Sequence, residues 1–214
     1  MRTKSGSKKY SFASQYEVAE PNVVVSPSKM NVFYVGVENP VDISVSGYSA
    51  EKISPTITQG SIRKDKGGGY IVTVNKPSKS EWVDVSVEVA PGKKQRMGKK
   101  EFRVKSLPTP QSKFAKKSGE AALGKGEFTA NEYVIAEMEN FDFDVKVAVT
   151  QFDMVFTVQG LSKTIQAKSN KVTSEMMDFM KKVKKGERIY IEGIKAKLPD
   201  GTVRDLPPIK VKII

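Results

Sequence analysis

Short runs of β-branched and aromatic residues, separated by Gly, Pro, Ser and Asn, dominate the first half of this 214-residue chain. The clearest run is residues 83–89, where valines alternate strictly with Asp84, Ser86 and Glu88. Successive side chains of a strand point to opposite faces, so this alternation predicts a strand with one buried and one solvated face. Trp82 falls on the same face of this strand as the polar residues, so we expect it to cover the strand's end or to lie on an interaction surface.

Runs of the same kind predict further strands in the first half, at residues 23–25, 32–35, 43–45, 70–74 and 101–105. The near-regular spacing of turn residues between them is typical of two packed sheets. Residues 65–69, Asp-Lys-Gly-Gly-Gly, supply glycines that tolerate positive φ, so a hairpin turn is expected there. The pattern therefore predicts an Ig-like β-sandwich over residues 17–107, preceded by an N-terminal extension or linker at 1–16.

The second half has one helical pattern, in which Met176, Phe179, Met180 and Val183 recur at i, i+3, i+4 and i+7. This spacing predicts an α-helix over 173–185, with Thr173 as its N-cap and Gly186 as its left-handed stop. The remaining pattern predicts a loop at 111–117, a tight turn at 199–202, and strands at 133–138, 145–149, 154–158, 188–198, 203–206 and 209–214.

Two prolines, Pro108 and Pro110, stand between the two halves. Proline withholds an amide donor and restricts the residue before it, so no regular element is expected to continue through them. We therefore predict a short, semi-rigid linker at 108–111. The expected fold is mainly β, with two tandem domains: the Ig-like sandwich, and a β-rich domain with one α-helix at 112–214.

The chain contains no histidine and no cysteine. Their absence excludes Ser-His and Cys-His nucleophile pairs and Cys/His zinc sites. The glycine-containing segments 67–69 and 124–126 lack the spacing of a phosphate-binding loop and are predicted to be turns. We expect no enzyme activity, no catalytic residue, no cofactor and no metal.

Four carboxylates, Glu137, Glu139, Asp142 and Asp144, form the only acidic cluster dense enough to suggest a metal site or a glycosidase. Their spacing matches no calcium loop, and paired carboxylates also occur on exposed strand faces. The favoured interpretation is a solvated acidic face, opposite a core formed by Phe141, Phe143 and Val145.

The net charge of +12 is spread along the chain. A nucleic-acid-binding protein would more often gather its lysines on one element and interleave aromatic residues, so no nucleic-acid partner is expected. Lysine runs at 93–96 and 99–100 flank Gly98 in an expected hairpin tip, where they could steer an acidic partner. The candidate partner-contact residues are Trp82, Lys93, Lys94, Arg96, Glu137, Glu139, Asp142 and Asp144.

Two segments of the chain are distinctive: residues 31–47 (NVFYVGVENPVDISVSG) and residues 136–147 (AEMENFDFDVKV). Both resemble the GldM/PorM family of the type IX secretion and gliding-motility machinery, and the lysine-rich loops are nearest to its PorM members. The segments KGERIYI at 185–191, PDG at 199–201 and LPPI at 206–209 fit the same family. Within them, Gly36 and Asn39-Pro40 are interpreted as a bend or bulge.

The resemblance implies a periplasmic C-terminal part of a single-pass inner-membrane protein whose transmembrane helix is not in this chain. It also implies a homodimeric rod across the envelope, with a PorL/GldL-like motor partner at the inner membrane. PorK/PorN-like ring proteins at the outer membrane would be the distal partners, and the chain would transmit force to them. The alternative is a secreted or surface β-sandwich that binds a glycan or an adhesion target, because fold alone does not separate these functions.

Overall fold

The computed structural model describes residues 2–3, 6–7, 13, 30–158 and 160–214, and the chain divides into two units, 1–30 and 31–214. In the first unit, β1 (Arg2–Thr3) and β2 (Gly6–Ser7) pair in antiparallel register. The predicted strand at 23–25, and most of the predicted extension at 1–16, lie outside the described residues.

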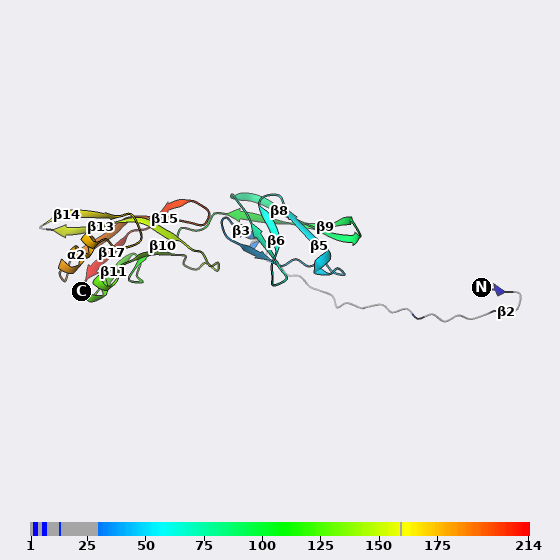
Figure 1. Cartoon of the computed structure of the whole chain (residues 1–214), viewed down its shortest axis with the longest axis horizontal. Helices are drawn as coiled ribbons and strands as arrows, with labels where there is room; N and C mark the ends of the chain where they lie inside the picture. Colours follow the sequence, from blue (N-terminus) through cyan, green and yellow to red (C-terminus); the bar gives the residue numbers. More distant parts are fainter. Residues whose placement is uncertain (1, 4–5, 8–12, 14–29, 159) are drawn as a thin grey trace. The chain divides into compact units, whose positions relative to one another are not determined.

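Residues 31–105 form an Ig-like β-sandwich of two sheets (Figure 1). The first sheet has the order β3-β9-β8-β5, from Val32–Tyr34, Lys93–Lys105, Ser78–Ala90 and Ile53–Ile57. The second has the order β4-β7-β6, from Asn39–Val41, Tyr70–Thr73 and Ser61–Lys64. A short 3-10 helix, η2 (Ala50–Lys52), precedes β5. The predicted sandwich is thus confirmed.

The valine alternation in β8 has the predicted effect only in part. Val83 and Val87 are almost fully buried, whereas Val85 is half-buried, as Trp82 is, and Val89 is exposed. The predicted hairpin turn joins β6 to β7, where the Asp65 amide donates to the Gly69 carbonyl at 2.8 Å and Gly68 has φ +94°.

The strand predicted at 43–45 is wrong. β4 already occupies 39–41 and pairs with Tyr70–Val72 at the start of β7, so residues 43–45 run beyond the end of their partner strand. The sequence prediction also missed β5 and β6. β5 contains Pro55, which removes an amide donor and is tolerated here because β5 is an edge strand.

Residues 111–214 form a six-stranded sheet, a two-stranded sheet and two helices. The large sheet has the order β11-β17-β15-β13-β14, with β16 paired to β15; these strands are Glu120–Leu123, Ile209–Ile213, Arg188–Lys197, Ala148–Val158, Leu161–Ala167 and Val203–Asp205. The small sheet pairs β10 (Gln111–Phe114) with β12 (Val134–Glu137). The terminal strand β17 pairs with β11 and β15, within its own part of the chain.

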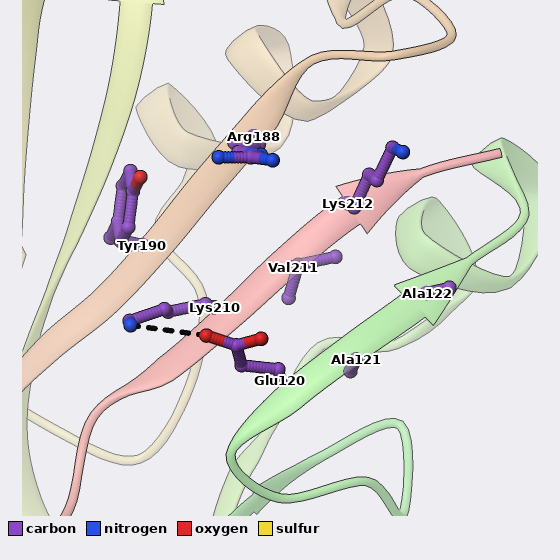
Figure 2. Close-up of a pocket in the computed structure, with 8 residues that line it drawn as sticks. All are labelled: Glu120, Ala121, Ala122, Arg188, Tyr190, Lys210, Val211 and Lys212. Carbon is purple, nitrogen blue, oxygen red and sulfur yellow. Dashed lines mark hydrogen bonds and ion pairs between the residues drawn. The ribbon is translucent and has the colours of Figure 1, made fainter.

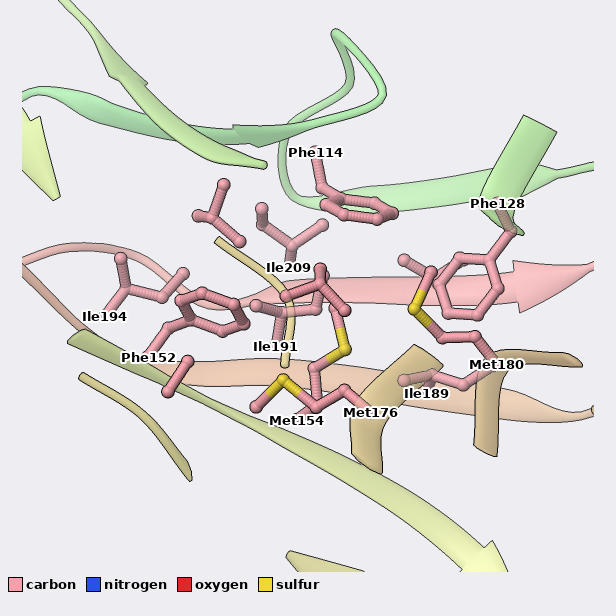
Figure 3. Packing of buried hydrophobic residues seen from close by; sticks show 14 of the residues in the cluster. Phe114, Phe128, Phe152, Met154, Met176, Met180, Ile189, Ile191, Ile194 and Ile209 are labelled. Atoms are coloured by element: carbon pink, nitrogen blue, oxygen red, sulfur yellow. The ribbon is translucent and has the colours of Figure 1, made fainter. Parts of the chain in front are cut away.

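One face of the large sheet carries the largest core cluster (Figure 3). Met154 of β13 and Ile191 of β15 pack there with Met176 and Met180 of α2 (Ser174–Lys182). Phe114 of β10 and Phe128 of α1 (Lys125–Ala130) meet edge-to-face, with ring centroids 5.7 Å apart. The alternate residues of β15 and β17 project from the opposite face, which is exposed.

The predicted helix is confirmed as α2, but it ends at Lys182. Gly186 has positive φ, as predicted, yet it lies in the turn after the helix, where its amide donates to the Ile213 carbonyl. Two predictions were wrong. Gly124 is the N-cap of α1, which begins at Lys125, so residues 124–126 are not a turn, and residues 111–114 of the predicted loop form β10. Among the described residues, no helix has the length and apolar character needed to span a bilayer.

Thr173 caps α2 by accepting a hydrogen bond from the Met176 amide at 3.2 Å. Replacing a capping hydroxyl by a methyl leaves that amide without its partner and costs about 1 kcal/mol. Thr173→Ala is therefore expected to lower the free energy of unfolding by that amount in urea denaturation. Thr173→Ser, which keeps the hydroxyl, is the control, and an equal loss in both variants would contradict the capping role.

Candidate interaction surfaces

Lys113 of β10 gathers two of the four candidate carboxylates. Its Nζ lies 2.8 Å from Glu137 Oε2 and 3.2 Å from Glu139 Oε1. Hydrogen bonds to Glu137 and then Glu139 raise the pKa of Lys113 above its ordinary value, so the lysine stays charged. A carboxylate already neutralised by a lysine is a weak candidate for metal binding or acid catalysis.

Asp142 and Asp144 lie apart from this ion pair, on the exposed side of residues 141–147. Exposure alternates along this segment as predicted, although the strand predicted at 145–149 begins only at Ala148. In the described part of the chain, no group of three or more His, Cys, Asp or Glu residues could hold a metal ion.

Phe141 and Phe143 were predicted to be core residues, and this prediction was wrong. Both are half-buried and lie against Tyr34 of β3, more than 100 positions earlier in the sequence. The Tyr34 ring is edge-on to both, with centroids 4.9 Å from Phe141 and 5.6 Å from Phe143. Aromatic pairs in this geometry are favourable beyond the area they bury. The rings therefore join the sandwich to the second half of the chain.

A second contact joins the same two parts of residues 31–214, and we call it the turn–turn contact. Gly36, in the turn after β3, lies against Pro199 and Asp200 in the turn between β15 and β16. A Cβ added at Gly36 would stand 2.5 Å from the Asp200 backbone nitrogen. Gly36 also has φ +80°, a conformation that glycine adopts without strain. The bend predicted at Gly36 is thus present, and only glycine fits this approach.

Asn39 fixes the shape of the turn that carries Gly36. It is buried, and its Oδ1 accepts from the Tyr34 amide at 2.8 Å. Its Nδ2 lies within hydrogen-bonding distance of the carbonyls of Tyr34, Val37 and Val72, at 3.0 to 3.2 Å. The Asn39 side chain therefore connects Tyr34 at the start of the turn, Val37 within it and Val72 of the adjacent strand β7.

Arg204 of β16 connects the opposing turn to the proline-containing segment. Its Nη2 lies 3.0 Å from Asp200 Oδ2, and its Nη1 donates to the Leu107 carbonyl. Asp200 also accepts from the amide and the hydroxyl of Thr202, at 2.9 and 2.6 Å. The segment before Pro108 is thereby held to the β15–β16 hairpin.

Burial raises the pKa of the Asp200 carboxyl, but the Thr202 hydrogen bonds and the Arg204 charge outweigh burial and leave that pKa below its ordinary value. A lowered folded-state pKa stabilises the protein above the unfolded value, and this contribution is lost as the pH falls through the folded value. Asp200→Asn should therefore reduce the free energy of unfolding at pH 7, by about 1–3 kcal/mol.

This difference from wild type should begin to narrow as the pH falls below the unfolded-state pKa of about 4, and it should shrink further as the pH falls through the lower folded-state pKa. Urea denaturation at pH 7 and pH 3 measures it. Asp205→Asn, at an exposed position of β16, is the matched control. A deficit of the same size at both pH values would show that the Asp200 charge does not contribute.

The predicted basic hairpin tip needs a correction, because the tip is formed by Pro91 and Gly92. The basic residues lie along β9, where residues 93–101 are all exposed. Arg96 is paired with Asp84 across the strands. Lys93 and Lys94 project from the start of β9, as an electrostatic surface would require.

Trp82 lies on the polar face of β8, as its position in the alternating pattern predicted. Lys99 Nζ stands 3.9 Å from the centroid of its ring, a cation–π contact. That ring face is therefore covered by a lysine of the neighbouring strand, which leaves it poorly placed to stack on a sugar.

Sequence reasoning missed the contacts made by Tyr34, Gly36 and Arg204, because each joins residues that are far apart in the chain. The one signal in the sequence was the glycine and the Asn-Pro pair in residues 36–40, which indicated a special turn but not its partner.

These features define a class of protein: mainly β, with an Ig-like sandwich followed by a second β-rich part, and with surface ion pairs and turn contacts as its prominent features. The family follows from the sequence matches. Residues 22–105 match the third domain of GldM, and residues 108–214 match the GldM C-terminal domain. The chain belongs to the GldM family, as the sequence resemblance indicated, and is thus a component of the gliding and type IX secretion machinery.

No curated protein matches the chain. Among solved structures, the fibronectin(III)-like modules of Clostridium thermocellum CbhA are 13% identical, with 86% of this chain and 88% of that chain covered. The TM-score is 0.28, and at that value the likeness carries no argument about fold or function.

Proposed function

We propose that this chain is a non-enzymatic scaffold and force-transmission module in the periplasm. In this proposal it is the distal part of a dimeric rod that links an inner-membrane motor to a ring associated with the outer membrane. Family membership supports the assignment to the machinery. The transmission role goes further and depends on the contacts between the sandwich and the second half.

The turn–turn contact is the observation that carries the proposal. Gly36 meets the Asp200 backbone at a distance that only glycine allows, and two further contacts lie nearby in the chain. These are the Tyr34 ring against Phe141 and Phe143, and the Arg204 bond to the Leu107 carbonyl. A joint fixed by several contacts resists bending better than a free linker and can pass on a displacement, because packed interfaces deform little.

The partners in this proposal are a second copy of the chain, a PorL/GldL-like protein at the inner membrane and PorK/PorN-like ring proteins at the outer membrane. The purified chain should capture the ring proteins from detergent-solubilised envelopes and retain them through a high-salt wash. Salt matters because exposed charges are screened beyond about 10 Å at 0.1 M salt.

Recovery of ring proteins at high salt is the expected result, with mass spectrometry as the readout. A capture that yields only acidic proteins or nucleic acid, all lost in salt, would contradict the proposed position in the machinery. Sedimentation of the purified chain tests the homodimer separately, and a monomer at all concentrations would remove that part of the proposal.

A further inference from the structure

The exposed face of the large sheet carries a basic depression, about 390 Å³ in volume, over β11, β15 and β17 (Figure 2). We call it the basic sheet face and define it by Arg188, Tyr190, Lys210 and Lys212. Lys210 and Lys212 are the outward residues of β17, whose intervening residues are buried. Arg188 and Tyr190 are their neighbours on β15.

The strand register sets the cations in a regular array. Arg188 lies directly opposite Lys212, and Tyr190 lies directly opposite Lys210. Adjacent strands are about 4.8 Å apart, and residues on the same side of a strand repeat about every 6.8 Å. Like charges directly opposite each other on neighbouring strands are destabilising. The pairing of Arg188 with Lys212 therefore carries a penalty that a bound anion would relieve.

The protein's own carboxylates neutralise little of the positive charge on this face. Glu120 of β11 pairs with Lys210 at 3.2 Å, and both side chains are more than half exposed. Within the described part of the chain, no carboxylate forms an ion pair with Arg188 or Lys212. The face thus offers two uncompensated cations and a third that is held by an exposed surface pair.

The geometry of the array favours an extended peptide over a single phosphate group. Lys210 and Lys212 are spaced by the strand repeat and do not converge on one point, as donors around a phosphate would. In an extended peptide, side chains two residues apart repeat at that same distance. Tyr190, which is half-buried, adds an aromatic surface for an intervening apolar side chain. A single aromatic ring gives no platform for stacking successive nucleotides.

We propose that the basic sheet face binds an extended segment of a partner protein in which Asp or Glu occupies alternate positions. The inference deepens the proposed interaction role and rests on it, since it names the chemistry of one partner. Glu120 sets the limit of the site, because its carboxylate would repel a partner carboxylate placed beyond Lys210. Charge complementarity of this kind determines register and association rate more than raw affinity.

The test uses the purified full chain and a fluorescent peptide in which glutamate alternates with threonine. A second peptide of the same composition, with its glutamates placed consecutively, is the probe control. Fluorescence anisotropy at low salt measures both affinities. We expect the alternating peptide to bind more tightly, with the difference reduced at high salt because exposed charges are screened.

The test variant combines Arg188→Gln with Lys212→Gln and so removes two charges from the basic sheet face. The control variant combines Lys181→Gln with Lys184→Gln and so removes two charges elsewhere. The matched lysines are exposed, in α2 and just after it, on the helix side of the sheet. The first pair should raise the dissociation constant for the alternating peptide about tenfold, and the control pair less than about twofold. Glu120→Gln should lower it, because a repelling charge is removed.

Equal binding of the two peptides, or an equal loss in both variant pairs, would overturn the proposal and leave only general attraction to positive charge. Binding to phosphatidylglycerol vesicles but not to peptide would assign the face to lipid and would also overturn it. The proposal would also be overturned if the chain bound no peptide but self-associated, and if that self-association were lost in the Arg188/Lys212 variant. Thermal unfolding verifies that each variant is folded, and ring capture is scored separately, so the two proposals fail independently.

Discussion

Gly36→Ala is expected to destabilise the protein far more than Gly47→Ala. The two glycines have φ +80° and +81°, so both substitutions force an alanine into the left-handed region at a cost of about 1 kcal/mol. Only Gly36 has a neighbour in the way: its new Cβ would lie 2.5 Å from the Asp200 nitrogen, whereas nothing lies within 4 Å at Gly47.

The obstacle at Gly36 is backbone, so the β15–β16 turn must move and the turn–turn contact is lost. Overpacking of this kind adds about 1–3 kcal/mol to the strain. We expect urea denaturation to show a loss of about 1 kcal/mol for Gly47→Ala and a loss of about 2–4 kcal/mol for Gly36→Ala. Faster proteolysis between residues 105 and 111 should accompany only the Gly36 variant. Equal losses in the two variants would contradict the turn–turn contact.

Asn39→Ala should have an effect of similar size by a different route. The substitution removes a buried side chain and leaves the Tyr34 amide and the nearby carbonyls without their partner. A buried polar group left unsatisfied costs about 1–3 kcal/mol, and more than one is created here. We therefore expect a loss of about 3 kcal/mol in the free energy of unfolding.

Asn75→Ala, at an exposed position in the same sandwich, is the control and should change stability by less than about 0.5 kcal/mol. The Tyr34 ring should also lose its fixed position against Phe141, which nuclear magnetic resonance of the aromatic protons would detect. An unchanged stability for Asn39→Ala would mean that the turn does not depend on these bonds.

Local pattern predicted the elements whose signals lie within a few residues. The valines of residues 83–89 gave the strand, and the capping threonine and apolar spacing gave α2, because period and caps are local properties. The predictions for Gly124 to Gly126 and for residues 43–45 were wrong. At residues 124–126, the glycines indicated a turn, but a helix begins there. At residues 43–45, the β-branched residues indicated a strand, but the partner strand ends before it could pair with them.

The candidate surfaces show the same limit more strongly. Phe141 and Phe143 alternate like core residues, and nothing near them in sequence indicates that they contact Tyr34. Arg188 and Lys212 are 24 positions apart, and only the strand register brings them opposite each other. The alternating lysines of 210 and 212 were a visible signal for an exposed strand face, but their meeting with Arg188 depends on the fold.

We propose that the chain transmits displacement through a fixed joint between its two parts. The most direct measurement introduces Gly36→Ala and Gly47→Ala into the full-length protein in its own bacterium and compares type IX secretion at equal protein levels. Secretion is expected to fall sharply in the Gly36 variant while ring proteins are still captured, and the Gly47 variant is expected to secrete normally. Normal secretion by a Gly36 variant whose turn–turn contact is shown to be lost would contradict the account.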